Sequence, residues 1–193
     1  MRLFSSDQAL RDLVAGNKRY AAARSIYPHQ TAARRTQVAR GQHPFAVILG
    51  CSDSRVPPEI VFDQGLGDLF VIRVAGNIVD DTVLGSIEYA AEHLGVRLVM
   101  VLGHKRCGAV DAAVKRGEAA GHISSLAEAI RPAVEKARGQ PGDLLDNAVK
   151  ANVERVVGQL QLSEPILVKL VKEGRLNIVG AYYDLESGVV DLI

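Results

Sequence analysis

The sequence has only two cysteines, no tryptophan and no apolar run long enough to cross a membrane. A single pair of cysteines cannot form the disulfide framework of a small secreted domain, which favours a reducing compartment. A transmembrane helix needs about 20 apolar residues, whereas the most apolar segments here, residues 45–50 and 98–103, have the length of a strand. No apolar segment of signal-peptide length precedes or follows Asp7 near the amino terminus. We therefore expect a cytoplasmic protein without a membrane partner.

An excess of charge of either sign is also lacking. The chain carries 23 basic and 22 acidic side chains, a formal net charge of +1. This balance gives no electrostatic reason for nucleic acid, an acidic polymer or a membrane surface as partner. The hydrophobic fraction of 48% is ample for a folded core, and the length suits a single domain over residues 1–193.

Four short apolar runs, each bounded by turn residues, predict strands that are buried on both faces. Helical patterns separate the strands, which is typical of an α/β fold with a mostly parallel central sheet of about four strands flanked by helices. The tail, residues 188–193, is a candidate for an antiparallel edge strand. The four runs lie at residues 45–49, 69–72, 98–102 and 176–179.

A helical amino-terminal arm, residues 1–40, is predicted ahead of an α/β core, residues 44–193. The first helix of the arm, residues 6–23, follows a capping-box pattern at Ser5 and Gln8. A second helix of the arm is basic, and we expect a solvated face for its arginines, Arg34, Arg35 and Arg40.

Six further helices are predicted within the core from periodicity and end signals. Ser163 is the expected N-cap of the last one, with Pro165 in its first turn, and Gly174 is its expected end. The six cover residues 57–62, 80–94, 107–116, 123–138, 143–160 and 163–173.

Two polar motifs directly follow two of the predicted strands. Residues 51–55, Cys-Ser-Asp-Ser-Arg, follow the first strand, and residues 104–107, His-Lys-Arg-Cys, follow the third. Open α/β sheets bind their ligands at the carboxyl ends of their strands. If these two strands are neighbours, Cys51, His104 and Cys107 converge on one point.

Two thiolates and one imidazole are a natural zinc site, because zinc prefers tetrahedral nitrogen and sulfur ligands and keeps an open position in catalytic sites. A water in that position can lose a proton near neutral pH. Taken singly, each residue also has a structural interpretation, since a lone buried cysteine usually packs as a small hydrophobe. Both cysteines at strand ends, with a histidine close to one of them, favour the metal site. His29, His43, His93 and His122 have no such neighbours in the sequence.

Asp53 and Arg55 are close enough in sequence to pair within a turn. An arginine partner keeps a carboxylate ionised and can bind it through two hydrogen bonds. The ionised Asp53 can then orient a hydroxide on the metal. Alternatively, Asp53 released from Arg55 can bind the metal itself and close the site.

These motifs resemble the signature of the β-class carbonic anhydrases, in which Cys-x-Asp-x-Arg is followed by His-x-x-Cys. Residues 63–77 and 83–90 also resemble family segments, and the likeness is strong over residues 44–110. The resemblance implies a carbonate dehydratase, a lyase that reversibly hydrates carbon dioxide to bicarbonate and a proton. It implies zinc on the two cysteines and the histidine, with zinc-bound hydroxide oriented by an Asp53–Arg55 dyad. Asp53 would be a fourth zinc ligand only in a closed form.

The resemblance also implies a substrate pocket. Gly108 matches a position whose backbone N–H holds bicarbonate, and Gln42 matches a glutamine that orients substrate. Phe70 and Tyr89 match aromatic positions that line the carbon dioxide pocket. In the family such residues come partly from a neighbouring subunit, which implies a homodimer or homotetramer with the helical arm packed on the partner. The alternatives are plain core positions for the two aromatic residues and a solvated loop for Gln42.

One departure from the family concerns a non-catalytic bicarbonate pocket that uses a tryptophan, an arginine and a tyrosine. Arg73 and Tyr183 match two of these positions, but Ile48 occupies the place of the tryptophan. This departure, together with Gln42, favours the open form of the enzyme, in which water binds the metal.

Two other functions remain open at this point. The same zinc site on a relative can hydrolyse carbon disulfide or carbonyl sulfide. A zinc-stabilised, non-catalytic bicarbonate-binding protein is the second alternative, although a structural site needs neither Asp53 nor Arg55.

Overall fold

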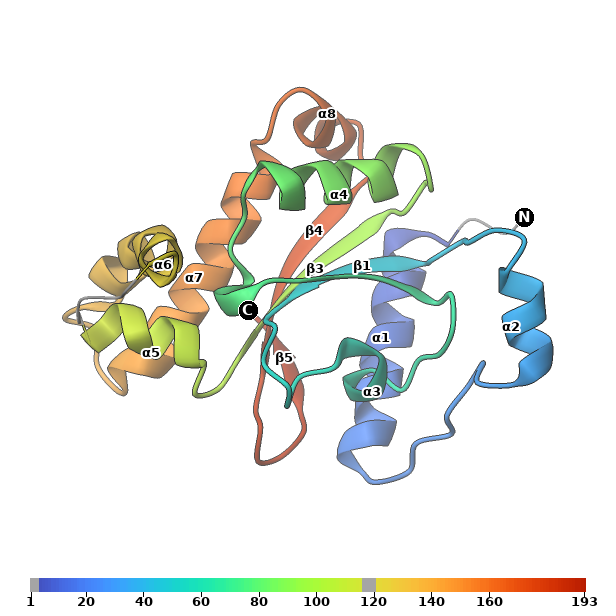
Figure 1. Ribbon diagram of the computed structural model, residues 1–193, viewed down its shortest axis with the longest axis horizontal. Helices are drawn as coiled ribbons and strands as arrows, with labels where there is room; N and C mark the ends of the chain where they lie inside the picture. Colours follow the sequence, from blue (N-terminus) through green and yellow to red (C-terminus); the bar gives the residue numbers. More distant parts are fainter. Residues whose placement is uncertain (1–3, 116–120) are drawn as a thin grey trace.

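The computed structural model describes residues 4–115 and 121–193, and these form an α/β fold around a mostly parallel sheet (Figure 1). The strand order is β2-β1-β3-β4-β5. All neighbouring pairs are parallel except β4 and β5, which are antiparallel. The four predicted strands and the carboxyl-terminal edge strand are confirmed, but the predicted burial on both faces is wrong for β2, which lies at the edge of the sheet and is only partly buried. Their bounds are β1 Ala46–Gly50, β2 Leu69–Arg73, β3 Leu98–His104, β4 Asn177–Tyr183 and β5 Val190–Leu192.

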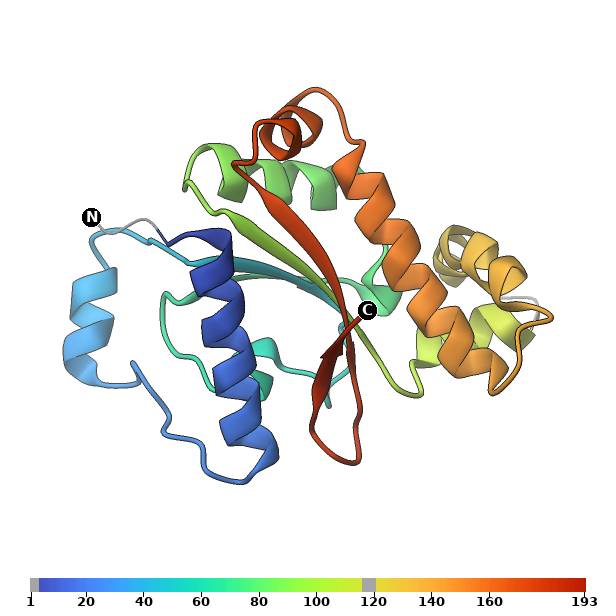
Figure 2. The same cartoon turned by 180° about the vertical axis from the view of Figure 1, so that it is seen from behind.

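Helices cover both faces of the sheet (Figures 1 and 2). α1 and α3 pack on one face, and α4, α7 and α8 pack on the other. α5 and α6 stand together at one side of the molecule, and α2 lies at the opposite side. The bounds are α1 Ser6–Ala21, α2 Ala32–Val38, α3 Pro58–Val61, a short 3-10 helix η1 Ala75–Asn77, α4 Asp81–Glu92, α5 Gly108–Lys115, α6 Ile123–Ala137, α7 Leu144–Gln161 and α8 Ile166–Lys172.

The central strand β1 explains why the apolar runs are continuous. Val47 and Leu49 belong to the core under α4, α7 and α8, whereas Ala46 and Ile48 belong to the core under α1. Successive side chains of a strand point to opposite faces, and here both faces are covered. The run is therefore apolar at every position, and the site residues that follow it start from a rigid, buried strand.

Side-chain caps fix the beginnings of several helices. Ser5 and Gln8 form the predicted capping box of α1, and Asp80 caps α4 by accepting from the Val83 N–H at 2.8 Å. The predicted start of the last helix at Ser163 is wrong, because α8 begins at Ile166. The Ser163 carbonyl instead accepts the N–H of Val168, five residues on, which is a wider turn than an α-helix makes.

The other predicted helix ends agree with the structure to within a few residues, with one position left open. Gly174 has the left-handed φ of 66° that suits glycine after a helix, and it follows α8 as predicted. The helix predicted over residues 107–116 corresponds to α5, but its last residue, Arg116, lies outside the described residues.

The helical arm is tied to the core through two buried aspartates. Asp63 accepts hydrogen bonds from the Arg19 side chain at 2.6 Å and from two backbone N–H groups of the loop after α1. Arg34 lies 3.2 Å from Asp68 and donates to the Leu66 carbonyl at 2.9 Å. The predicted solvated face is therefore wrong for Arg34, because the loop before β2 folds back against α2, whereas Arg35 and Arg40 are exposed.

Within the described part of the chain, no helix combines the length and the apolar character that a membrane span requires.

Candidate metal centre

The two motifs meet at the carboxyl ends of β1 and β3. These strands are parallel neighbours, with Gly50 of β1 in register with Leu102 of β3. Cys51 directly follows β1, and His104 is the last residue of β3. Cys107 returns to the same point because Arg106 adopts a left-handed φ of 53° and turns the chain into α5. The predicted convergence of the three residues is confirmed.

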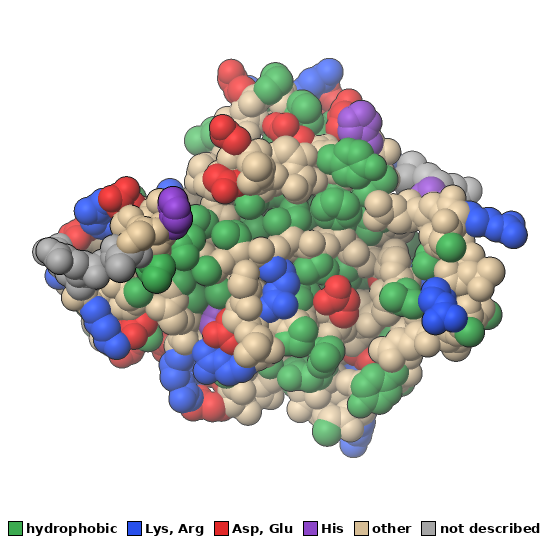
Figure 3. Space-filling model, in the orientation of Figure 1, with side chains coloured by type: hydrophobic (Ala, Val, Ile, Leu, Met, Phe, Trp, Pro, Cys, Tyr) green, Lys and Arg blue, Asp and Glu red, His purple; other side chains and the backbone are tan. Residues whose placement is uncertain are grey.

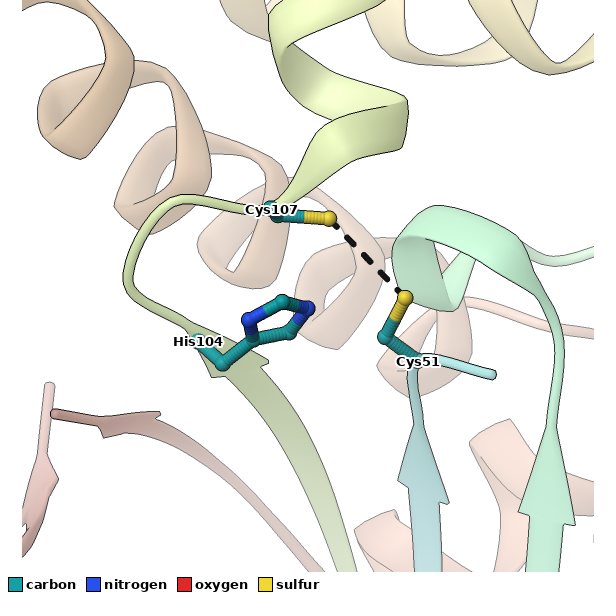
Figure 4. A group of neighbouring side chains, drawn as sticks. All are labelled: Cys51, His104 and Cys107. Atoms are coloured by element: carbon teal, nitrogen blue, oxygen red, sulfur yellow. Dashed lines mark hydrogen bonds between the residues drawn. The ribbon is translucent and has the colours of Figure 1, made fainter. Parts of the chain in front are cut away.

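The ligand atoms of these three residues lie within 4.8 Å of one another, and Figure 4 shows the three side chains grouped together. The two sulfur atoms are 3.9 Å apart. All three residues are buried, with relative exposures of 4%, 0% and 1% for Cys51, His104 and Cys107. Such a compact, buried set of one nitrogen and two sulfur atoms can hold a metal ion that prefers these ligands.

The ring of His104 is oriented by its own backbone neighbour. Nδ1 lies 3.0 Å from the Lys105 carbonyl, and because a carbonyl only accepts, Nδ1 must carry the proton. Nε2 then presents a free lone pair toward the sulfur atoms. This atom is buried and has no hydrogen-bond partner within the described residues, which is the environment of a histidine that binds a metal.

The pKa values of the two thiols are shifted in opposite directions. Hydrogen bonding with Cys107 lowers the pKa of Cys51, against the effect of burial, and the Gly76 N–H acts in the same direction. The pKa of Cys107 is raised, because it holds the shared proton against Cys51 and is buried. Cys51 therefore loses its proton readily, and its negative charge disfavours ionisation of Cys107. A bound cation would favour the ionised form of both cysteines.

Asp53 and Arg55 form a two-pronged ion pair at the edge of this cluster. Arg55 Nε and Nη2 donate to the two carboxylate oxygens at 2.9 and 2.7 Å. These hydrogen bonds hold the pKa of Asp53 well below its ordinary value. One carboxylate oxygen lies 3.8 Å from His104 Nε2, so an ionised acceptor faces the metal cluster.

Arg73 supports the same turn from β2, a role that sequence reasoning did not assign. Its side chain donates to the Cys51 carbonyl at 2.9 Å and to the Asp53 carbonyl at 2.5 Å. Its place at the carboxyl end of an adjacent strand was the available signal, but the contacts themselves depend on the register of β1 and β2.

The remaining predicted residues lie at different distances from the centre. Gly108 opens α5 directly after Cys107, and no described atom beyond its chain neighbours would lie within 4 Å of a Cβ at this position. Gln42 is exposed in the loop before β1, at the other end of that strand from Cys51. Phe70 and Tyr89 contact each other, with ring centroids 6.3 Å apart, and Phe70 pairs with Val47 well before the end of β1. In a single chain these three residues are not part of the metal cluster.

Known proteins similar to this chain include carbonic anhydrases. The carbonic anhydrase family profile matches residues 46–190. Carbonic anhydrase from Mycolicibacterium smegmatis is 41% identical over 189 residues, covering 96% of this chain and 90% of the relative. Carbonic anhydrase 2 from Mycobacterium tuberculosis is 42% identical over 184 residues, covering 93% and 89%.

Solved structures agree with this assignment. One of two tetrameric β-carbonic anhydrases from the ascomycete Sordaria macrospora superposes with a TM-score of 0.78 at 25% identity, covering 95% of this chain and 96% of that chain. The Coccomyxa β-carbonic anhydrase, solved in complex with acetazolamide, gives a TM-score of 0.76 at 30% identity, covering 95% and 86%. The chain therefore belongs to the β-carbonic anhydrase family of enzymes.

Proposed function

We propose that this chain catalyses the zinc-dependent, reversible hydration of carbon dioxide to bicarbonate and a proton. The observation that carries the proposal is the convergence of Cys51, His104 and Cys107 beside the carboxylate of Asp53. Family membership supports the same reaction, since the most similar relatives described above are carbonic anhydrases.

The donor set fits zinc. Two sulfur atoms and one imidazole nitrogen suit its preference for tetrahedral nitrogen and sulfur ligands, and three protein ligands leave a fourth position open. The buried, unpartnered Nε2 of His104 is otherwise an unexplained cost of the fold. Zinc bound here would activate water as a nucleophile near neutral pH.

Asp53 would orient the attacking water. Its carboxylate is ionised at neutral pH and can only accept hydrogen bonds, so it selects the orientation in which the water points an O–H toward it and a lone pair toward carbon dioxide. Arg55 supports this role because its two hydrogen bonds fix the carboxylate plane. The same ion pair keeps Asp53 away from the fourth metal position, which favours the open form of the site.

Gly108 would hold the product. It begins α5, and the N–H groups of a first helical turn have no partner within the helix and favour an anion. The open space around its Cα leaves room for bicarbonate beside the last ligand, Cys107.

The substrate pocket would be completed across a subunit interface. β2 is an edge strand, and an edge with unpaired backbone groups is a surface that natural proteins cover or pair. Figure 3 shows apolar side chains gathered across the middle of the face below α4, and Tyr89 is 47% exposed although its ring packs at a tilt against Phe70. We propose that a second copy of the chain packs here and brings Phe70, Tyr89 and Gln42 to a shared pocket. The tetrameric state of the Sordaria enzymes supports such an assembly.

The decisive measurement is the rate of carbon dioxide hydration against pH, by stopped flow, on protein of measured zinc content. We expect about one zinc per chain and turnover at neutral pH. Turnover that appears only in alkali would mean that Asp53 closes onto the metal. Zinc-loaded protein without turnover at any pH would refute the proposal, and carbon disulfide and carbonyl sulfide would then be the substrates to assay.

Two variants separate metal binding from orientation. Cys107→Ser should lose both zinc and activity. Asp53→Asn should retain zinc, and its turnover should fall by about 100-fold or more, the scale of a lost acid–base contact. The matched control is Asp111→Asn, which removes an exposed ion pair with Lys115 at 2.6 Å and should leave both properties unchanged. Full zinc occupancy in Cys107→Ser would contradict the ligand assignment.

A further inference from the structure

The peptide that follows β2 donates a hydrogen bond to one of the candidate metal ligands. The N–H of Gly76 in η1 lies 3.2 Å from the sulfur of Cys51, and Figure 4 shows this turn beside Cys51. Gly76 has a left-handed φ of 73°, and a Cβ here would lie 2.6 Å from the end of the Ile130 side chain. Only glycine fits at position 76. Because glycine has more backbone freedom than other residues, the direction of its N–H depends on contacts from other parts of the chain.

Asn152 of α7 supplies such a contact. Its side-chain nitrogen donates to the Gly76 carbonyl at 2.9 Å, and the orientation of the amide is settled because a carbonyl only accepts. The carbonyl of Gly76 is thus held by Asn152 while its N–H faces the Cys51 sulfur. The two peptide groups that flank the glycine are fixed together, from a helix far away in the sequence.

Asn152 reaches this peptide because α7 packs closely on two glycines of the sheet. A Cβ on Gly103 of β3 would be 2.6 Å from the neighbouring side chain of Val153, and a Cβ on Gly180 of β4 would be 2.8 Å from it. Val153 therefore packs against the two glycines, where a side chain would leave no room for it. This close packing of α7 on the sheet places Asn152 beside η1.

Packing alone does not explain an asparagine at this position. Asn152 is 1% exposed, and its side-chain oxygen has no hydrogen-bond partner within the described residues. The surrounding buried positions of α7 are apolar or small: Ala148, Val149, Ala151, Val153 and Val156. A buried amide with an unsatisfied oxygen is unfavourable, so the useful part of the side chain is its donor to Gly76.

We propose that Asn152 is a positioning residue of the metal centre, an inference that rests on the metal site in the proposed function. By holding Gly76, it keeps an N–H directed at Cys51, and this N–H withdraws charge from the thiolate. Hydrogen bonds to an ionised acceptor are strong, and groups that orient metal ligands tune the metal and its affinity. Asn152 would thus set how much electron density Cys51 gives to the metal, without touching substrate or metal.

The test compares two buried asparagines. In Asn152→Leu the Gly76 carbonyl loses its donor. The control is Asn17→Leu, because Asn17 is also buried, at 4% exposure, and donates to two backbone carbonyls, those of Val61 and Gly188, away from the metal centre. Each protein is loaded with cobalt for the sulfur-to-cobalt charge-transfer spectrum, and zinc affinity is measured by competition with a chromophoric chelator.

We expect the charge-transfer band of Asn152→Leu to move to lower energy and its zinc affinity to fall by about tenfold or more. Asn17→Leu should lose thermal stability but keep the parent band and affinity. If Asn152→Leu does not fold, Asn152→Ala, in which a water can replace the amide, should show smaller changes in the same direction.

A parent-like band and affinity in the Asn152 variants, or the same changes in Asn17→Leu, would overturn the role of Asn152 while leaving the metal site intact. A parent chain that binds neither ion through its thiolates would overturn this inference and the proposed function together.

Discussion

Asp63 is the most sharply testable anchor of the helical arm. Its buried carboxylate accepts from Arg19 at 2.6 Å and from the N–H groups of Ile26 and Tyr27 at 3.1 and 3.0 Å. It therefore joins the end of α1 and the following loop to the segment after α3. Asp63→Asn keeps the shape of the side chain and its left-handed backbone, which asparagine tolerates, but replaces one acceptor oxygen with a donor.

The expected cost follows from these contacts. An NH2 group facing N–H donors forfeits at least one charge-assisted hydrogen bond, worth about 1.5–3 kcal/mol. Breaking a fully buried ion pair costs about 3–5 kcal/mol, but the Arg19 side chain is 31% exposed and can turn toward water. We therefore expect a loss of about 2–3 kcal/mol at neutral pH, which for a chain of this size lowers the melting temperature by about 4–12 °C.

The pH dependence provides a second test. Burial by itself would raise the pKa of Asp63, but Arg19 and the two backbone N–H groups outweigh it, so the pKa in the folded state is lowered. The stabilisation from Asp63 is then fully present above the unfolded pKa of about 3.9 and is lost as pH falls through the folded pKa. The difference between the parent and Asp63→Asn should accordingly shrink as the solution is acidified below about pH 4.

Urea denaturation followed by far-ultraviolet circular dichroism, at one fixed protein concentration, measures both effects. The control is Glu173→Gln, which removes a surface ion pair with Arg175 at 3.1 Å and should cost at most about 0.5 kcal/mol. A cost below about 0.5 kcal/mol for Asp63→Asn, or a gap that stays constant as the pH falls, would refute the assignment of Asp63 as a charged anchor.

Three further predictions concern the site and its surroundings. Gly103→Ala should cost about 1–3 kcal/mol by overpacking, because its Cβ would lie 2.6 Å from Val153; adding Val153→Ala should recover part of the stability in urea titrations. Arg73→Met should lower zinc affinity in chelator competition, since it removes the donors to the carbonyls of Cys51 and Asp53. An unchanged affinity would show that the turn from Cys51 to Asp53 keeps its conformation without Arg73. If the chain forms the assembly proposed above, Phe70→Glu should shift its sedimentation toward the monomer, whereas Leu162→Glu, at a residue that is 75% exposed, should not; equal sedimentation of both variants would rule out β2 as the contact edge.

Local patterns were enough to predict most of the fold. The four apolar runs became β1 to β4, of which β1 and β3 are buried throughout and the edge strand β2 only partly, and the capping box at Ser5 became the start of α1. The local signals failed at two positions. Ser163 looked like an N-cap, but its carbonyl bonds the N–H of Val168 in a wider turn, and Arg34 looked solvated until the loop before β2 placed Asp68 beside it.

The residues of the candidate site also fall into two groups, those predicted from their place at strand ends and those assigned by resemblance. Cys51, His104 and Cys107 could be predicted as candidates because each stands at the end of a strand or a few residues beyond it. Their convergence also required β1 and β3 to be neighbours, which the tertiary structure supplied. Gln42, Phe70 and Tyr89 were assigned by resemblance, and in a single chain they lie away from the metal cluster. Their roles stay predictions that depend on a second copy of the chain.

The sequence by itself determined the α/β architecture, the three candidate metal ligands and the Asp53–Arg55 pair, since these depend on periodicity and on short spacings along the chain. Only the tertiary structure decided the contacts that tune the centre: Gly76 against the Cys51 sulfur, and Asn152 against Gly76. The physical reason is that a hydrogen bond between residues 76 positions apart has no local signature. It forms where Val153 packs on two glycines of the sheet and α7 comes close enough for Asn152 to reach the Gly76 carbonyl.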